Sequence, residues 1–110
     1  MRDIPVDEWE REGTKLFGPD RMEWSFVCPV CGHVAKVMDW RDAGAPDSAV
    51  AFSCVGRWIE GPKDAFRRDG EGPCSYAGGG LFKLNPINVV HADGHGAAMF
   101  DFARPKETRG

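Results

Sequence analysis

The sequence contains no long hydrophobic run. Its longest unbroken apolar stretches are four residues, such as residues 49–52, whereas a membrane-spanning helix needs about 20. The N-terminal segment lacks the apolar core of a secretory signal. We therefore expect a cytoplasmic protein with no membrane partner. In that reducing compartment, cysteines more often bind metal or take part in catalysis than form disulfides.

Positive charge is also scarce. The 110 residues carry 14 Lys and Arg against 17 Asp and Glu, which gives a net charge of −3. No block of basic residues is long enough to neutralise several phosphates. Charge therefore disfavours a nucleic-acid partner without excluding it, and we expect a protein partner.

What the sequence does contain is cysteine, glycine and proline. There are 4 cysteines, 14 glycines and 8 prolines, so many turns and irregular loops are expected. The length suits one domain with a modest core. Small size, many loops and four cysteines together are typical of a domain cross-linked by zinc. We predict one zinc-stabilised domain over residues 1–103 and a flexible polar tail over residues 104–110.

Hydrophobic periodicity predicts one N-terminal helix over residues 5–17. Trp9, Gly13 and Leu16 fall on one helical face, and Gly18 followed by Pro19 is a typical stop signal. We interpret Trp9 as a core anchor.

Short strands are predicted after this helix. The expected strands are residues 23–27, 33–38, 49–52, 81–84, 87–90 and 97–102. Asp93-Gly94 is a strong hairpin-turn signal between the last two. The expected fold class is α+β: a small zinc-ribbon-like domain with one N-terminal helix packed on antiparallel β-hairpins.

The segment Cys28-Pro29-Val30-Cys31-Gly32 is the most informative part of the sequence. A Cys-x-x-Cys bend lets both sulfurs face one metal ion, and Gly32 can adopt the positive φ that turns the chain back. A thioredoxin-like redox pair would need the motif at a helix N-terminus. Because a strand is predicted after Gly32, the metal interpretation is favoured.

A structural zinc site requires four ligands, and two further thiols are available. We predict one structural Zn²⁺ per chain, held by Cys28, Cys31, Cys54 and Cys74. The second pair is not a knuckle, so replacement of one thiol by a histidine remains open. The candidates for that replacement are His33, His91 and His95.

Two other segments could carry chemistry. His91, Asp93 and His95 have the residue types of a metal-dependent hydrolase, but the hairpin turn between the histidines favours a water-exposed loop tip. The run of glycines at 78–80 lacks the features of a phosphate-binding loop. Close backbone packing against the metal loop explains these glycines better. No catalytic residue is predicted.

Basic and aromatic residues alternate over residues 57–68. The candidate partner-binding residues are Arg57, Trp58, Lys63, Phe66, Arg67 and Arg68. Single-stranded nucleic acid could use such a pattern, but acidic neighbours leave this loop with few net positive charges. A protein partner is favoured, with Trp58 as an anchor. By its type alone, Trp58 fits a buried core position equally well.

Several of these segments together resemble a family of small, uncharacterised phage and prophage proteins with a Cys-Pro-x-Cys-Gly-His knuckle. The matching segments are residues 9–18, 26–33, 39–40, 52–57 and 73–86. The resemblance covers residues 5–103. It implies phage origin, a bacterial host cytoplasm and four cysteines acting together, but no catalytic residue. The family has an acidic residue after the last cysteine, where this chain has Ser75.

The expected function is therefore non-catalytic binding to a host or phage protein complex, and inhibition of a host defence complex is one form it could take. A metal-dependent hydrolase and a nucleic-acid-binding accessory protein are the alternatives.

Overall fold

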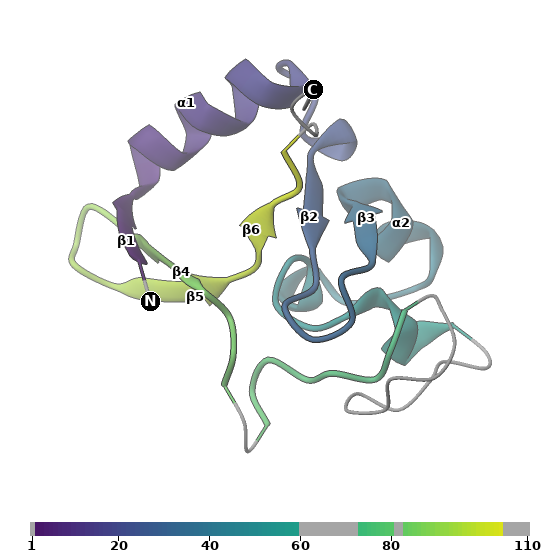
Figure 1. Ribbon diagram of the computed structural model, residues 1–110. Coiled ribbons are helices and arrows are strands. Elements are labelled where there is room, and N and C mark those ends of the chain that lie inside the picture. The colour runs from purple at the N-terminus through teal and green to yellow at the C-terminus, as the bar shows by residue number, and fades with distance from the viewer. Residues whose placement is uncertain (1, 60–72, 81–82, 105–110) are drawn as a thin grey trace, which may run out of the picture.

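The computed structural model describes residues 2–59, 73–80 and 83–104 (Figure 1). The α-helices are α1 (Val6–Phe17) and α2 (Val37–Asp42). The strands are β1 (Arg2–Pro5), β2 (Ser25–Val27), β3 (Val34–Lys36), β4 (Ile87–Val90), β5 (Gly96–Met99) and β6 (Asp101–Phe102). Short 3₁₀ turns span Arg21–Glu23, Asp47–Ala49 and Val55–Trp58. The α+β class with one main helix is confirmed.

The strands form two small sheets with three strands each, in the orders β1-β4-β5 and β3-β2-β6. In the first sheet, β4 and β5 form the predicted antiparallel hairpin, and β1 lies parallel to β4. The second sheet is antiparallel throughout, with Phe26 of β2 opposite both Ala35 and Phe102. Strand β1 was not predicted, because only Ile4 of its four residues is buried and no alternating pattern marks it.

Helix α1 confirms the predicted helix, starting at Val6 directly after Pro5. Its buried residues are Trp9 and Gly13. A Cβ on Gly13 would lie 2.5 Å from the Trp24 ring, so this glycine lets the two packing surfaces approach closely. The helix ends where the Gly18 N–H bonds to the carbonyl of Thr14 at 2.8 Å, with Gly18 at a φ of 92°.

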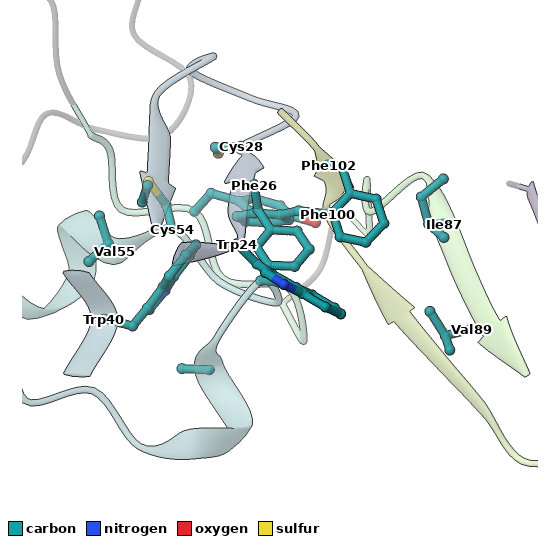
Figure 2. Packing of buried hydrophobic residues seen from close by; sticks show 14 of the residues in the cluster. Trp24, Phe26, Cys28, Trp40, Cys54, Val55, Ile87, Val89, Phe100 and Phe102 are labelled. Carbon is teal, nitrogen blue, oxygen red and sulfur yellow. The ribbon is translucent and has the colours of Figure 1, made fainter. Parts of the chain in front are cut away.

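An aromatic cluster joins α1 to the second sheet, and Figure 2 shows the part of this cluster that includes Trp24, Phe26 and Phe102. The Phe102 ring centroid lies 5.5 Å from that of Trp9 and 5.1 Å from that of Phe26, both in stacked arrangements. Trp40 of α2 is 1% exposed, and its indole N–H donates to the carbonyl of Ser53 at 3.0 Å. The aromatic core is thereby connected to the loop that carries Cys54.

The strand predicted over residues 49–52 is wrong. The segment forms the end of a 3₁₀ turn at Ala49 and then a tight turn in which the N–H groups of Phe52 and Ser53 both donate to the Ala49 carbonyl. Ala51 has a φ of 56°, which a strand does not permit. A turn rather than a sheet buries Ala49 and Ala51 and leaves Val50 and Phe52 half-buried.

Four other predicted strands differ in extent. The strand expected over 23–27 begins at Ser25, because Arg21–Glu23 forms a 3₁₀ turn, and the one expected over 97–102 is divided into β5 and β6, which belong to different sheets. The strand expected over 33–38 ends at Lys36, because α2 begins at Val37 and Asp39 accepts the Lys36 N–H at 2.8 Å. Of the strand expected over 81–84, Lys83 and Leu84 are exposed and not in a strand, and residues 81–82 lie outside the described residues.

At the C-terminal end, Arg104 contacts Glu12 of α1 and pairs with Asp101 at 2.9 Å. The rest of the predicted tail, residues 105–110, lies outside the described residues. Within the described ranges, the helices are all too short or too polar to cross a bilayer.

Candidate metal centre

The four cysteines lie together in the folded chain. Their sulfur atoms are all within 4.8 Å of one another, with Cys28 and Cys74 separated by 4.0 Å and Cys31 and Cys54 by 3.8 Å. All four are free thiols. Three of them are at most 2% exposed, and Cys31 is half-buried.

The first pair sits on a tight bend between β2 and β3. The Cys28 N–H donates to the carbonyl of His33 at 3.0 Å, and the Gly32 N–H donates to the carbonyl of Cys28 at 2.9 Å. Gly32 has a φ of 78°, as the sequence predicted. The Val30 nitrogen lies 3.4 Å from the Cys28 sulfur, and the His33 nitrogen lies 3.4 Å from the Cys31 sulfur. These donors favour thiolates.

The second pair comes from two loops that pack backbone to backbone. The Cys54 N–H donates to the carbonyl of Tyr76 at 2.9 Å, and the Cys74 N–H lies 3.4 Å from the Cys54 sulfur. Gly56 permits this contact, because a Cβ there would lie 2.3 Å from the Cys74 carbonyl oxygen. Gly78 likewise permits a close backbone contact, because a Cβ there would lie 2.1 Å from the Phe52 carbonyl oxygen.

Gly56→Ala is therefore expected to push apart the loops that carry Cys54 and Cys74. The three nearest atoms that the new methyl group would meet are backbone atoms of Pro73 and Cys74, so no side chain can move aside. We expect about 1–3 kcal/mol lower unfolding free energy and weaker retention of a cysteine-bound metal ion against a chelator. Gly79→Ala is the matched control, since its Cβ would make only ordinary contacts at 3.7 Å with the Phe52 ring. Equal melting temperatures and equal metal retention in the two variants would contradict this role of Gly56.

The thiols have unequal acidities. A hydrogen bond from the Cys28 thiol lowers the pKa of Cys54 to about 5, and backbone hydrogen bonds from Gly56 and Cys74 act in the same direction. The same Cys28–Cys54 bond, together with burial, raises the pKa of Cys28. Burial raises the pKa of Cys74 to about 12. One thiolate is thus stabilised by the protein alone, whereas the raised pKa values of Cys28 and Cys74 disfavour their ionisation without a bound cation.

The arrangement fits a tetrahedral metal ion. Zn–S bonds of about 2.3 Å place the sulfurs of a regular tetrahedron about 3.8 Å apart. The separations of 3.8 and 4.0 Å lie close to that edge length. The cluster could therefore hold one metal ion with all four positions filled by sulfur.

Comparison with known proteins places the chain in a family. The VVA0879-like family matches residues 5–103, a span that includes all four cysteines. The chain belongs to the VVA0879-like family. No curated protein matches it, and no solved structure matches it either.

The histidines of this VVA0879-like chain lie apart from the sulfur cluster, except for His33. The half-buried His33 contributes its backbone N–H to the Cys31 sulfur. His91 and His95 are exposed on the β4–β5 turn, where Asp93 accepts the His95 N–H at 2.9 Å. In the described parts of the chain, the four cysteines are the only group of three or more metal-ligating side chains. The turn interpretation is thus favoured over the hydrolase.

We expect the double variant His91→Ala, His95→Ala to keep the cysteine-bound metal and its stability. Both side chains are exposed, and the hydrogen bonds of the turn are made by backbone groups and Asp93. Exposed substitutions of this kind usually change the unfolding free energy by less than about 0.5 kcal/mol each. Thermal melts and metal quantification check this expectation, and loss of the tightly held metal ion would restore the hydrolase hypothesis.

Only two of the predicted partner-binding residues lie in the described part of the chain. Arg57 is exposed, and Trp58 is half-buried with part of its surface against the core cluster. The Arg57 guanidinium lies 5.7 Å from the centre of the Trp58 ring and donates to the Ser75 carbonyl at 3.4 Å. The others lie outside the described residues: Lys63, Phe66, Arg67 and Arg68.

Sequence reasoning missed the part played by Gly56. The residue stands two positions after Cys54, and no turn signal distinguishes it. Its role depends on the backbone of Cys74, which is 18 residues away and reaches it only in the folded chain. By contrast, close packing was predicted for the glycines at 78–80 and is confirmed for Gly78.

Proposed function

We propose that the chain is a non-catalytic binding protein of phage origin, stabilised by one structural zinc ion, that acts on a host or phage protein complex in the bacterial cytoplasm. The observation that carries the proposal is the closed sulfur cluster: four thiols within 4.8 Å of one another. Structural zinc sites have four protein ligands, whereas catalytic sites keep one position open for water or substrate. The origin and the compartment are proposed from the resemblance of the sequence segments to phage and prophage proteins.

Zinc is the metal that best suits this donor set in a domain of this kind. Four thiolates with tetrahedral geometry suit zinc or iron. The tetrahedral iron sites of electron-transfer proteins use two matched Cys-x-x-Cys knuckles, and this chain has only one. Zinc would connect the three segments that carry the cysteines, which contain few helices or strands to hold them together. It would supply no redox chemistry.

The partner surface is proposed to include Arg57 and Trp58. These residues directly follow Val55 and Gly56, which pack beside the cluster, so a metal ion would fix the base of the surface. A pre-ordered base lowers the entropic cost of binding. The exposed guanidinium over the half-buried indole offers an apolar contact area with positive charge, which suits an acidic protein surface.

Affinity capture from phage-infected bacterial cells tests this proposal, with the tagged parent and the tagged Trp58→Ala variant compared. We expect the parent to retain a specific protein complex and the variant to bind that complex about 2 kcal/mol more weakly, which is roughly a thirtyfold loss. Because Trp58 also packs against the core cluster, part of the effect will appear as lower stability. The variant's melting temperature separates the two contributions.

Three outcomes would overturn the proposal. A variant as stable and as tightly bound as the parent would place the interface elsewhere. Capture of nucleic acid, with an affinity that falls steeply as salt rises, would favour the nucleic-acid accessory function. A stability loss of about 3–5 kcal/mol with unchanged binding would make Trp58 a core residue only.

A further inference from the structure

The β4–β5 hairpin brings two histidines side by side. Val90 pairs with Gly96 at the last position of the ladder, and the His91 N–H donates to the carbonyl of His95 at 2.8 Å. The antiparallel pairing thus continues by one residue, and directly opposed residues project to the same face of a sheet. The two imidazole rings accordingly lie 6.2 Å apart, measured between their centroids.

The turn between the two histidines fixes their backbone. Gly94 has a φ of 89° and donates its N–H to the His91 carbonyl at 2.8 Å. Asp93 accepts the His95 N–H at 2.9 Å. Three hydrogen bonds therefore hold the short loop, and the Asp93 carboxylate belongs to the turn rather than to a ligand set. The pair is pre-organised on the backbone, while both side chains remain free to rotate in solvent.

Two neutral imidazoles at this separation match the needs of a late transition-metal ion. Metal–nitrogen bonds of about 2.0–2.1 Å place two ligand nitrogens on one ion roughly 3 Å apart. Rotation of two exposed rings that start 6.2 Å apart brings one nitrogen of each to that spacing. Imidazole nitrogen suits nickel, copper and zinc, whereas calcium and magnesium require oxygen ligands.

The surroundings of His91 also suit a cation. His91 lines a groove of about 550 Å³ between the end of β4 and the start of α1. Asp3 and Asp7 line the same groove, and their carboxylates give it negative charge. The groove has room for the water molecules that complete the coordination of an ion held by only two protein ligands.

We propose that His91 and His95 form a second, surface metal site that takes a divalent late transition-metal ion of the nickel and copper type. The ion is held by one nitrogen from each imidazole, with water in the remaining positions. Such a site is exchangeable, unlike a closed four-sulfur site. It involves no hydrolytic chemistry, because the turn already uses Asp93. The proposal is independent of the zinc-stabilised binding function.

Nickel titration of the untagged, zinc-loaded chain tests this site. Paramagnetic Ni²⁺ is expected to broaden the NMR signals of the His91 and His95 imidazoles first, while those of His33 stay sharp. His91→Gln and His95→Gln should each lower the nickel affinity at least tenfold. His33→Gln is the matched control and should bind nickel as the parent does. Zinc content and melting temperature, measured on every variant, confirm that the fold is intact.

Several results would overturn the second site. One is an unchanged nickel affinity in the variant that lacks both histidines. Another is earlier broadening of His33 than of His91 and His95. A third is thiolate-to-nickel absorption with sharp His91 and His95 signals, which would place the nickel in the cysteine cluster. Because the broadening is measured on the parent chain, this part of the test does not depend on the behaviour of any variant.

Discussion

Cys74→Ser is expected to abolish stoichiometric zinc binding and to unfold the domain. Cys74 is fully buried, and its sulfur lies 4.0 Å from that of Cys28. In the proposed site, zinc binding contributes on the order of 10 kcal/mol of apparent folding free energy at neutral pH. That value is comparable to the whole stability of a typical domain, about 5–15 kcal/mol. Losing one of four ligands therefore removes most of what keeps the chain folded.

The measurement combines metal quantification with a thermal melt followed by circular dichroism. Ser75→Ala is the matched control, because it changes the neighbouring side chain and leaves all four sulfurs in place. A strong chelator added to the parent should reproduce the Cys74→Ser melt. A Cys74→Ser chain with one zinc per chain and the parent melting temperature would show that the ligand assignment is wrong.

Trp40→Ala is expected to have the second largest effect, a loss of about 3–5 kcal/mol in unfolding free energy. The Trp40 side chain is 1% exposed and packs edge-on against Phe26 at 6.5 Å between ring centroids. Its indole N–H also satisfies the carbonyl of Ser53, the residue before Cys54. The substitution therefore leaves a cavity in the aromatic core and loosens the loop that carries one sulfur.

Trp40→Phe separates these two contributions. The smaller ring keeps most of the packing but leaves the Ser53 carbonyl without its donor, which costs about 1–3 kcal/mol. Denaturant unfolding in the presence of excess zinc measures both variants. If the proposed zinc ion binds only the folded chain, added zinc should raise their stability by mass action. If Trp40→Ala had the same unfolding free energy as the parent, the connection between the aromatic core and the loop that carries Cys54 would have no energetic importance.

The candidate site could be predicted from the sequence to a large extent, because it depends on residue type. Only four side chains in the chain are thiols, and the Cys-Pro-Val-Cys-Gly segment specifies its own bend through local geometry. The positive φ of Gly32 follows from that bend. The structure brings the predicted Cys54 and Cys74 to this knuckle, although nothing in their spacing fixes the distance between them.

The fold was less predictable where the apolar character of a segment does not determine its backbone conformation. Residues 49–52 have the apolar character of a strand, yet they form a turn in which the N–H groups of Phe52 and Ser53 both donate to the Ala49 carbonyl. Strand β1 is defined by its pairing with β4, in which Ile4 pairs with Val89, more than 80 positions along the chain. Such contacts depend on tertiary structure, which local patterns do not encode.

Helix α1 and the β4–β5 hairpin were predictable for the opposite reason. The helix has one apolar face and a glycine stop, and both signals lie within the segment itself. The hairpin turns at Asp93-Gly94, where Gly94 adopts the positive φ that its turn requires. Elements whose determinants are local can be predicted from the sequence, whereas the close approach at Gly56 could not.

X-ray absorption at the zinc edge, on protein purified from bacterial cells without added metal, tests the central claim most directly. The four-cysteine assignment predicts one zinc per chain with a first shell of four sulfur atoms at about 2.3 Å. The closest rival assignment, one imidazole in place of a thiol, predicts a nitrogen at about 2.0–2.1 Å and three sulfurs. A shell that contains nitrogen, or a chain that folds without zinc, would contradict the account.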